Sequence, residues 1–376
     1  METLHAAQGS FDLTRYPLRQ RDVLRAWDAA DEYLLNYLNE QNEHGDDVRT
    51  LILNDAWGAL STALAGRAPQ MLSDSLLAHR ATRENLARNG LSSDSIRLLT
   101  PLELPTHPID LLLFKVPKSK ALLEDQLHRL RPLLHPGTAV IGAGMVRDIH
   151  TSTLELCQRL IGPTHTSLAQ KKARLIFAAL DAHLDPGPSP YPTRYVLEGT
   201  DWTLENAANA FSRQRLDNGT RLLLGHIPSD PSRRHIADLG CGNGVLGIVA
   251  AARNPQSEVI FVDESFTAVE SARGNFTRIF GSRPARFVAG DGLSESAPDS
   301  LDLVLCNPPF HRQKAIDETV PWRLFGQAHA ALRRGGQLLI VGNSGLRHHV
   351  RIRRLFGTCQ TVDSNGPFTV LSATKR

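Results

Sequence analysis

The sequence has few cysteines and no long apolar run, and each absence excludes a class of protein. The four cysteines among 376 residues lie far apart and form no CxxC pair, which argues against a disulfide framework and a cysteine-based metal site. The longest apolar stretches, such as GVLGIVAAA at 244–252, are far shorter than the roughly 18 residues that span a bilayer. The first residues also lack the basic and apolar segments of a signal peptide. We therefore expect a cytoplasmic protein with no membrane association and no bound metal.

The chain has little excess of charge of one sign, because its net charge is only +3. The first 185 residues carry 20 Lys and Arg against 22 Asp and Glu, whereas the remaining residues carry 22 against 17. Part of the positive excess lies in NSGLRHHVRIRRLFG at 343–357, which holds Arg347, Arg351, Arg353 and Arg354. Such a segment can attract a polyanion, or it can be a solvated helix face.

A proline-rich stretch near the middle of the chain indicates two domains. AHLDPGPSPYPT at 182–193 contains four prolines and a glycine and can sustain neither a helix nor a sheet ladder. The chain is also longer than a single hydrophobic core usually supports. We predict a first domain over residues 1–185 and a second over residues 186–376.

The same order of elements is predicted on both sides of this linker. The second half reads as a strand, a glycine turn and a helix, then a strand ending in an acid, then further short buried strands that alternate with helices. RTLILNDAWGALSTALA at 49–65 and IDLLLFKVPKS at 109–119 repeat this order, with Asp74 as the expected counterpart of Asp263. Counting from Asp110 and Asp302 places Lys115 opposite Asn307. We predict two tandem α/β units, each a mostly parallel sheet covered by helices on both faces; chance similarity between buried strands is the alternative.

The segment DLGCGNGVLG predicts a nucleotide-binding loop. Three spaced glycines before a helix that starts near Val245 let backbone N–H groups approach a ligand. The GxGxG spacing differs from the GxGxxG of dinucleotide binders, and Asp238 offers a carboxylate to an ammonium group. The loop thus favours S-adenosylmethionine over NAD. The predicted cofactor-binding residues here are Asp238, Gly240, Cys241, Gly242, Asn243 and Gly244.

Two further acids follow the next predicted strands. Asp263 closes VIFVDES 19 residues after Gly244, a spacing typical of acids that accept ribose hydroxyls. Asp291 in VAGDGL can accept a hydrogen bond from an adenine amino group, and Gly292 lets the base lie close. Each acid alone could be a surface or turn residue. Together with the glycine loop they predict the nucleoside part of a donor site.

The run LDLVLCNPPFH ends a predicted strand with residues suited to orienting an amine. The lone pair of an exocyclic amine on a nucleobase is delocalised into the ring, so the planar nitrogen is a poor nucleophile. The amide oxygen of Asn307 and the carbonyl of Pro308 can accept its two N–H bonds, while the two prolines fix the backbone. Phe310 offers a stacking face. We predict Asn307, Pro308, Pro309 and Phe310 as catalytic residues, with Asn307 also beside the donor and His311 as a hydrogen-bonding loop residue; a rigid turn is the alternative.

These segments resemble a known family. DLGCGNG, VDES, GDGL and NPPFH, with FSRQRLDNGTRLLL at 211–224, are similar to the bacterial ribosomal RNA guanine-N2 methyltransferases built of two tandem methyltransferase-like domains, the first degenerate. LRAWDAADEYLLNYL, LILNDAWGALSTALA and RATRENLARNG resemble the large-subunit members more than the small-subunit ones.

The resemblance implies two Rossmann-like class I methyltransferase domains with sheets of the seven-stranded type and S-adenosylmethionine as donor. It also implies one guanine of 23S rRNA, in protein-poor RNA, as acceptor, and no obligate protein partner. Lys115 departs from the pattern at the position of Asn307, so the first domain is expected to serve RNA binding or structure rather than methylation.

Three other activities stay open at this level. The acceptor could be 16S rRNA, since the small-subunit enzymes are close relatives. The NPPF segment also suits the side-chain amide of glutamine in a protein substrate. Alternatively, the chain could be an RNA-binding assembly factor that keeps the fold without turnover.

Overall fold

The computed structural model describes residues 2–18, 24–41, 48–309 and 319–376. The chain divides into two compact units, Met1–Pro190 and Tyr191–Arg376. Among the described residues, each unit contains one seven-stranded sheet and one separate two-stranded hairpin. Within the described segments, no helix has the length and apolar character needed to cross a membrane.

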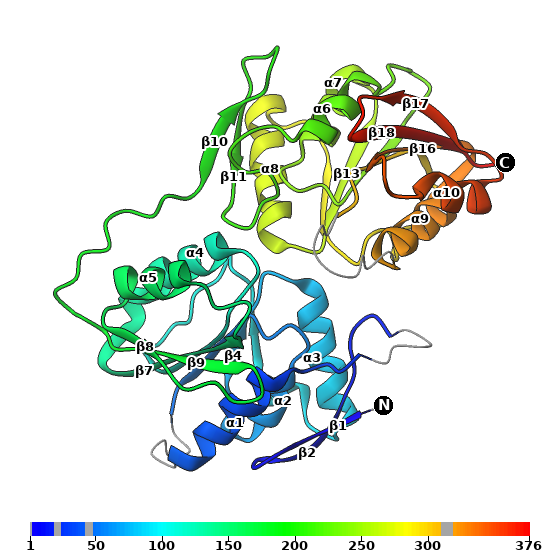
Figure 1. Ribbon diagram of the computed structural model, residues 1–376. Helices are drawn as coiled ribbons and strands as arrows, with labels where there is room; N and C mark the ends of the chain where they lie inside the picture. The colour runs from blue at the N-terminus through cyan, green and yellow to red at the C-terminus, as the bar shows by residue number, and fades with distance from the viewer. Residues whose placement is uncertain (1, 19–23, 42–47, 310–318) are drawn as a thin grey trace. The chain divides into compact units, whose positions relative to one another are not determined.

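The first unit places its strands in the order β5-β4-β3-β6-β7-β9-β8, with β9 antiparallel to both of its neighbours and the other pairs parallel (Figure 1). Its strands are β1 (Glu2–Ala6), β2 (Gly9–Leu13), β3 (Thr50–Leu53), β4 (Gln70–Leu72), β5 (Arg97–Leu99), β6 (Ile109–Lys115), β7 (Leu134–Met145), β8 (Thr164–Thr166) and β9 (Ala173–Ala178). Its α-helices are α1 (Ala29–Gln41), α2 (Ala59–Ala63), α3 (Leu76–Arg88), α4 (Lys120–Leu130) and α5 (Thr151–Leu160).

The second unit repeats this arrangement in the order β14-β13-β12-β15-β16-β18-β17, again with its penultimate strand antiparallel to both neighbours. Its strands are β10 (Thr193–Val196), β11 (Thr203–Asn206), β12 (His235–Leu239), β13 (Glu258–Asp263), β14 (Arg286–Ala289), β15 (Leu301–Cys306), β16 (Leu332–Asn343), β17 (Gln360–Ser364) and β18 (Phe368–Thr374). Its helices are α6 (Asn218–Gly225), α7 (Val245–Arg253), α8 (Phe266–Phe280), α9 (Thr319–Ala331) and α10 (His348–Phe356). Two tandem, mostly parallel seven-stranded α/β units are thus confirmed.

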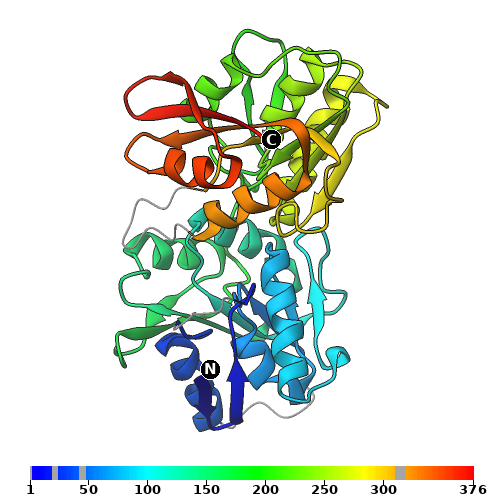
Figure 2. The same ribbon diagram turned by 90° about the vertical axis from the view of Figure 1, so that its right-hand side faces the viewer.

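Both faces of the second sheet are covered by helices, and every residue of its central strand β15 is buried. Along β15, Leu303 and Leu305 pack with α6, α7 and α8, whereas Val304 and Cys306 pack with α9 and α10. This alternation follows from the two-residue period of a strand. Figures 1 and 2 show the resulting three layers, with helices on both sides of the sheet.

The strand registers align the two units residue by residue. Leu53 pairs with Phe114 in the first unit, as Leu239 pairs with Cys306 in the second. Lys115 and Asn307 each come one residue later, so they are equivalent. On the other side, Leu53 pairs with Leu72 and Leu239 pairs with Val262.

One predicted equivalence is therefore wrong by one residue. Because Leu72 and Val262 are equivalent, Ser73 stands at the position of Asp263. Asp74, which the sequence pattern matched to Asp263, corresponds to Glu264 instead. The first unit thus carries no acid at the position predicted to bind ribose.

Candidate donor and acceptor site

Four strands of the second unit deliver the predicted site residues to one edge of the sheet. Leu239 pairs with both Val262 and Cys306, so the chain leaves β12, β13 and β15 at neighbouring positions. Gly240, Asp263 and Asn307 are the residues at these three exits, and β14 pairs with β13 up to Ala289, just before Asp291. Parallel sheets of this kind bind ligands at the carboxyl ends of their strands.

The loop between β12 and α7 turns at three glycines with different surroundings. Gly240, Gly242 and Gly244 have φ angles of 71°, 53° and 84°, in the left-handed region that favours glycine. A Cβ added at Gly240 or Gly242 would meet no heavy atom of the described residues within 4 Å, whereas one at Gly244 would lie 2.9 Å from the Cβ of Ala272. The first two glycines leave the backbone accessible to a ligand. The third lets α8 pack closely against the loop.

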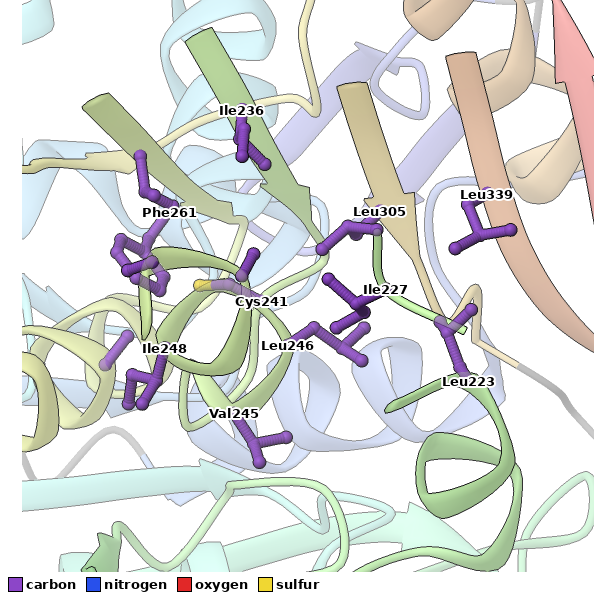
Figure 3. Close-up of a cluster of buried hydrophobic side chains, with 14 of the residues drawn as sticks. Leu223, Ile227, Ile236, Cys241, Val245, Leu246, Ile248, Phe261, Leu305 and Leu339 are labelled. Atoms are coloured by element: carbon purple, nitrogen blue, oxygen red, sulfur yellow. The ribbon is translucent and has the colours of Figure 1, made fainter. Parts of the chain in front are cut away.

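An apolar cluster holds the loop and α7 against the sheet (Figure 3). Cys241 belongs to this cluster, so only its backbone remains for a ligand, and burial raises the pKa of its thiol well above the ordinary value. The labelled members are Leu223, Ile227, Ile236, Cys241, Val245, Leu246, Ile248, Phe261, Leu305 and Leu339. The backbone of the loop is thereby fixed before any ligand arrives.

Asp238 is a fully buried acid with one oxygen that is hydrogen-bonded and one that is not, among the described residues. Its Oδ2 accepts the N–H of Gly247 at 2.8 Å, in the first turn of α7, which ties this helix to β12. Its Oδ1 has no hydrogen-bond partner among the described residues. Burial, with a smaller contribution from Asp263, raises the pKa of Asp238 to about 8. An ammonium group would relieve this cost, because a buried carboxylate is stabilised by an opposite charge.

Asp263 and Asn243 support the loop from two sides. Asp263 accepts the N–H of Gly242 at 3.0 Å and the N–H of Ser265 at 3.0 Å. Asn243 donates to the hydroxyl of Tyr195 at 2.9 Å and to the amide oxygen of Asn206 at 2.7 Å, so its side chain faces the β10–β11 hairpin. The side chain of Asn243 therefore has a structural role, and its backbone remains part of the predicted loop contact.

Asp291 and Gly292 interact mainly with α9. The guanidinium of Arg323 forms an ion pair with Asp291. A Cβ on Gly292, whose φ is 56°, would lie 2.1 Å from the amide oxygen of Gln327. That oxygen accepts the N–H of Leu293, and the Gln327 amide donates to the carbonyl of Asp291. Close approach of Gln327 explains the glycine; the predicted adenine contact stays a prediction.

The side-chain amide of Asn307 has its nitrogen hydrogen-bonded and its oxygen without a partner among the described residues. Its Nδ2 donates to Oγ1 of Thr220 at 2.8 Å and to Oδ2 of Asp217 at 3.3 Å. Its Oδ1 is buried and has no hydrogen-bond partner among the described residues. The next two residues differ, since Pro308 is buried and Pro309 is exposed. Phe310 and His311, with their predicted stacking and hydrogen-bonding roles, lie outside the described residues.

The sequence analysis did not find the contact between Asn307 and the start of α6. Asp217 caps this helix by accepting the N–H of Thr220 at 2.9 Å. An acid directly before a helical segment whose apolar residues begin at Leu222 is a recognisable N-cap signal. Nothing in that local pattern reveals that the cap reaches a residue 90 positions further along the chain.

The first unit fills the equivalent site with its own charges. Lys115 forms ion pairs with Asp28 at 2.8 Å and with Asp31 at 2.7 Å. Burial acts to lower the pKa of Lys115, but the two carboxylates outweigh it and raise that pKa. The amide of Asn54 pairs with Gln126 at 2.8 Å, and the buried Asp55 accepts the N–H groups of α2. These contacts lie at the ends of β3 and β6, which correspond to the ends of β12 and β15 in the second unit.

The open oxygens of Asp238 and Asn307 and the bare glycine turn between them fit S-adenosylmethionine. Asp238 is available to pair with the ammonium of such a donor, the loop backbone can approach its amino-acid part, and Asp263 lies at the strand end suited to a ribose. A seven-stranded sheet with its penultimate strand antiparallel and this loop after its first central strand define a class: the second unit is an S-adenosylmethionine-dependent methyltransferase domain of the Rossmann-like type.

Comparisons with known proteins agree with this class. Residues 1–182 match the RLMG N-terminal domain and residues 201–372 match the methyltransferase small domain. Ribosomal RNA large subunit methyltransferase G of Streptomyces griseus is 49% identical over 384 residues, covering 100% of both chains. The protein of that name from Pseudomonas aeruginosa PAO1 is 50% identical over 366 residues, covering 97% of each. The chain belongs to the family of ribosomal RNA large subunit methyltransferase G.

A solved structure is similar over the same length. The T. thermophilus 16S rRNA N2 G1207 methyltransferase (RsmC), solved in complex with AdoMet and guanosine, superimposes with a TM-score of 0.77. The match covers 100% of this chain and 98% of that chain at 24% sequence identity. At this identity the similarity supports the tandem fold alone.

Proposed function

We propose that this protein transfers a methyl group from S-adenosylmethionine to the exocyclic N2 of a guanine in 23S rRNA. The observation that carries the proposal is the amide oxygen of Asn307 at the strand exit next to Gly240, which is buried and has no hydrogen-bond partner within the described part of the chain. An oxygen in that place can accept a hydrogen bond from an amine that approaches the donor. The choice of RNA rests on the relatives, which are named for the large ribosomal subunit.

The bound donor supplies an electrophilic methyl on a sulfonium, and the protein's part is to orient the amine. Asn307 Oδ1 and the carbonyl of Pro308 accept its two N–H bonds and turn the nitrogen lone pair toward the methyl. The methyl–sulfur bond breaks as the nitrogen–carbon bond forms, and the methylated amine then releases a proton to water. No general base is needed before transfer, since the amine becomes acidic only once it is alkylated.

We assign this chemistry to the second unit and a structural or RNA-holding role to the first. The first unit has an ammonium, Lys115, at the position of the acceptor amide and lacks two of the three loop glycines. An enzyme that modifies ribosomal RNA works where ribosomes are assembled, so we place the protein in the bacterial cytoplasm.

Incubation with labelled S-adenosylmethionine and three separate substrates tests the function. Protein-stripped 23S rRNA should become labelled at guanine N2, while stripped 16S rRNA and a peptide-release factor should stay unlabelled. The Asn307→Ala variant is the control for contaminating activity. Label in 16S rRNA alone would move the substrate to the small subunit, label in the release factor would indicate a protein-glutamine enzyme, and no label anywhere would favour an RNA-binding assembly factor.

A further inference from the structure

The amide of Asn307 has two possible orientations, and only one of them is useful for catalysis. The acceptor role requires Oδ1 to point to the open side and Nδ2 to point into the protein. A flip of the amide by 180° would exchange these atoms and present N–H donors to an amine, which needs acceptors. Something must therefore hold the amide in one orientation.

The start of α6 provides that restraint. Oδ2 of Asp217 lies 3.3 Å from the amide nitrogen, and a carboxylate can only accept hydrogen bonds, so a flipped amide would place oxygen against oxygen. The hydroxyl oxygen of Thr220 accepts a hydrogen bond from Nδ2 of Asn307 at 2.8 Å. The same hydroxyl donates its proton to Oδ2 of Asp217 at 3.3 Å. The three polar side chains form a closed set in which each proton has an acceptor.

The set is rigid because of where its members lie. Thr220 is 5% exposed, and Asp217 also accepts the backbone N–H of Thr220, so the first turn of α6 fixes both side chains. Gly219 between them leaves no room for a side chain, since a Cβ there would lie 3.0 Å from the ring of Phe368 and 3.1 Å from Asp217 Oδ2. If Asp217 turned away, the helix would lose its N-cap hydrogen bond to Thr220, and if Thr220 turned away, its hydroxyl would lose Asp217 as acceptor.

The first unit contains the same arrangement with its charges changed. Lys115 stands at the position of Asn307 and contacts two residues that are three positions apart at the start of α1, Asp28 and Asp31. Asp28 accepts the N–H of Ala30 in the first turn, much as Asp217 accepts that of Thr220. A strand-end side chain held by the first turn of the helix that comes before the first strand of the sheet is thus a feature of both sheets.

We infer that Asp217 and Thr220 are positioning residues, which hold the amide of Asn307 so that Oδ1 faces the amine of guanine. This inference rests on the proposed function and names residues that it does not. Neither residue touches the reacting atoms; both act through Asn307. Their removal should therefore lower kcat and leave the donor affinity and the KM for RNA nearly unchanged.

Thr220→Val tests this, because valine keeps the shape of threonine and removes the acceptor. We expect kcat on stripped 23S rRNA to fall about 10-fold to 100-fold, as for a misplaced catalytic group, with donor affinity by calorimetry within 2-fold or so of the parent. Thr220→Ser keeps the hydroxyl and should restore kcat to within about 3-fold. Melting temperatures of all variants separate a folding defect from a positioning effect.

A double-mutant cycle decides between action through Asn307 and an independent role. In an Asn307→Ala background, adding Thr220→Val should cause no further loss of kcat, because the group to be positioned is gone. Additive losses, or a Thr220→Val protein with full kcat, would overturn the inference while leaving the proposed function intact. Absence of guanine methylation by the parent protein would instead overturn the proposed function.

Discussion

Asn54 in the first unit stands at the position of Gly240 in the second. Asn54 directly follows Leu53, the last residue of β3 that pairs with β6, and Gly240 directly follows Leu239, the last residue of β12 that pairs with β15. Both have positive φ angles, 61° for Asn54 and 71° for Gly240. Where Gly240 exposes bare backbone, the Asn54 amide is paired with Gln126. The two units thus share one backbone path and differ in whether side chains cover it.

Asn307→Ala should lower kcat about 100-fold and change donor affinity by only a few-fold, since the amide orients the acceptor rather than the donor. Steady-state kinetics on stripped 23S rRNA and calorimetry with S-adenosylhomocysteine measure the two effects. Asn218→Ala, which removes an exposed amide at the start of α6, is the matched control. A large loss of donor affinity would place Asn307 in the donor pocket instead.

Asp263→Ala should weaken donor binding by at least about 10-fold, because it removes the ribose acceptor and also the support of the Gly242 N–H. Calorimetry measures the dissociation constant directly. Glu270→Ala, at a half-exposed acid on α8, should bind the donor like the parent. Unchanged affinity of the Asp263 variant would remove this residue from the site.

Lys115→Asn should not create a second donor site, because Asn54 and Asp55 still cover the loop of the first unit; calorimetry should give one donor per chain. The variant should instead lose about 3 kcal/mol of stability, since Asp31 is left buried without its cation. Adding Asp31→Thr recreates the Asn, Asp and Thr set of the second unit, which has no cation and only one acid, and should recover much of that loss. Urea unfolding measures the free energy of unfolding of the single and double variants. Equal values for the two would contradict the equivalence of Asp31 with Thr220.

Asp238→Asn should change how stability depends on pH. The pKa of Asp238 in the folded protein is about 8, above its ordinary value of 3.8, so the folded state holds a proton that the unfolded state has lost. Its contribution to stability therefore decreases as pH rises from about 4 to 8. In urea unfolding without donor, the free energy of unfolding of the variant, relative to that of the parent, should increase by more than about 1.4 kcal/mol between pH 5 and pH 8.

The control for this pH effect is Glu270→Gln, which makes the same acid-to-amide change at a half-exposed position on α8. A difference in stability between the Asp238→Asn protein and its parent that stays constant from pH 5 to pH 8 would mean that Asp238 is ionised throughout this range.

Arg353→Glu combined with Arg354→Glu should weaken RNA binding without affecting the donor. Both side chains are exposed on α10 and form no ion pair among the described residues, so phosphates are available partners. Binding to stripped 23S rRNA, measured over a series of salt concentrations, should show a smaller salt dependence, by about one unit of slope for each lost phosphate contact. Arg273→Glu, at an arginine paired with Glu270, is the control. An unchanged slope would identify α10 as a solvated face.

The repeated unit and the glycine loop were predictable because both depend on local patterns. Apolar strands of β12 and β15 and the helix after Gly244 follow from runs of residue types a few positions long. The error at Asp74 has a simple origin, since a sequence does not reveal which of two adjacent polar residues ends a strand. Register with the neighbouring strand decides that, and it selected Ser73.

The support of the site was not predictable, because it comes from contacts between distant segments. Asn307 meets Asp217 and Thr220 across 90 and 87 residues, and Gly292 is required by Gln327, a residue on a helix 35 positions away in the chain. Such contacts depend on how α6 and α9 pack on the sheet. The sequence pointed to Asp263 and Asn307 at the strand ends, but not to the residues that hold Asn307 in place.

The third glycine of the loop has a counterpart in the first unit, whereas the first two have none. Gly58 corresponds to Gly244, and a Cβ on either would collide with the helix packed behind it, at Thr82 in one unit and at Ala272 in the other. The third glycine is therefore required by helix packing in both units, whatever the units bind. Gly240 and Gly242 have open space where a side chain would lie, so packing does not require them; on the proposed function, it is their absence from the first unit, and not the shared Gly58, that separates a unit without donor binding from one with it.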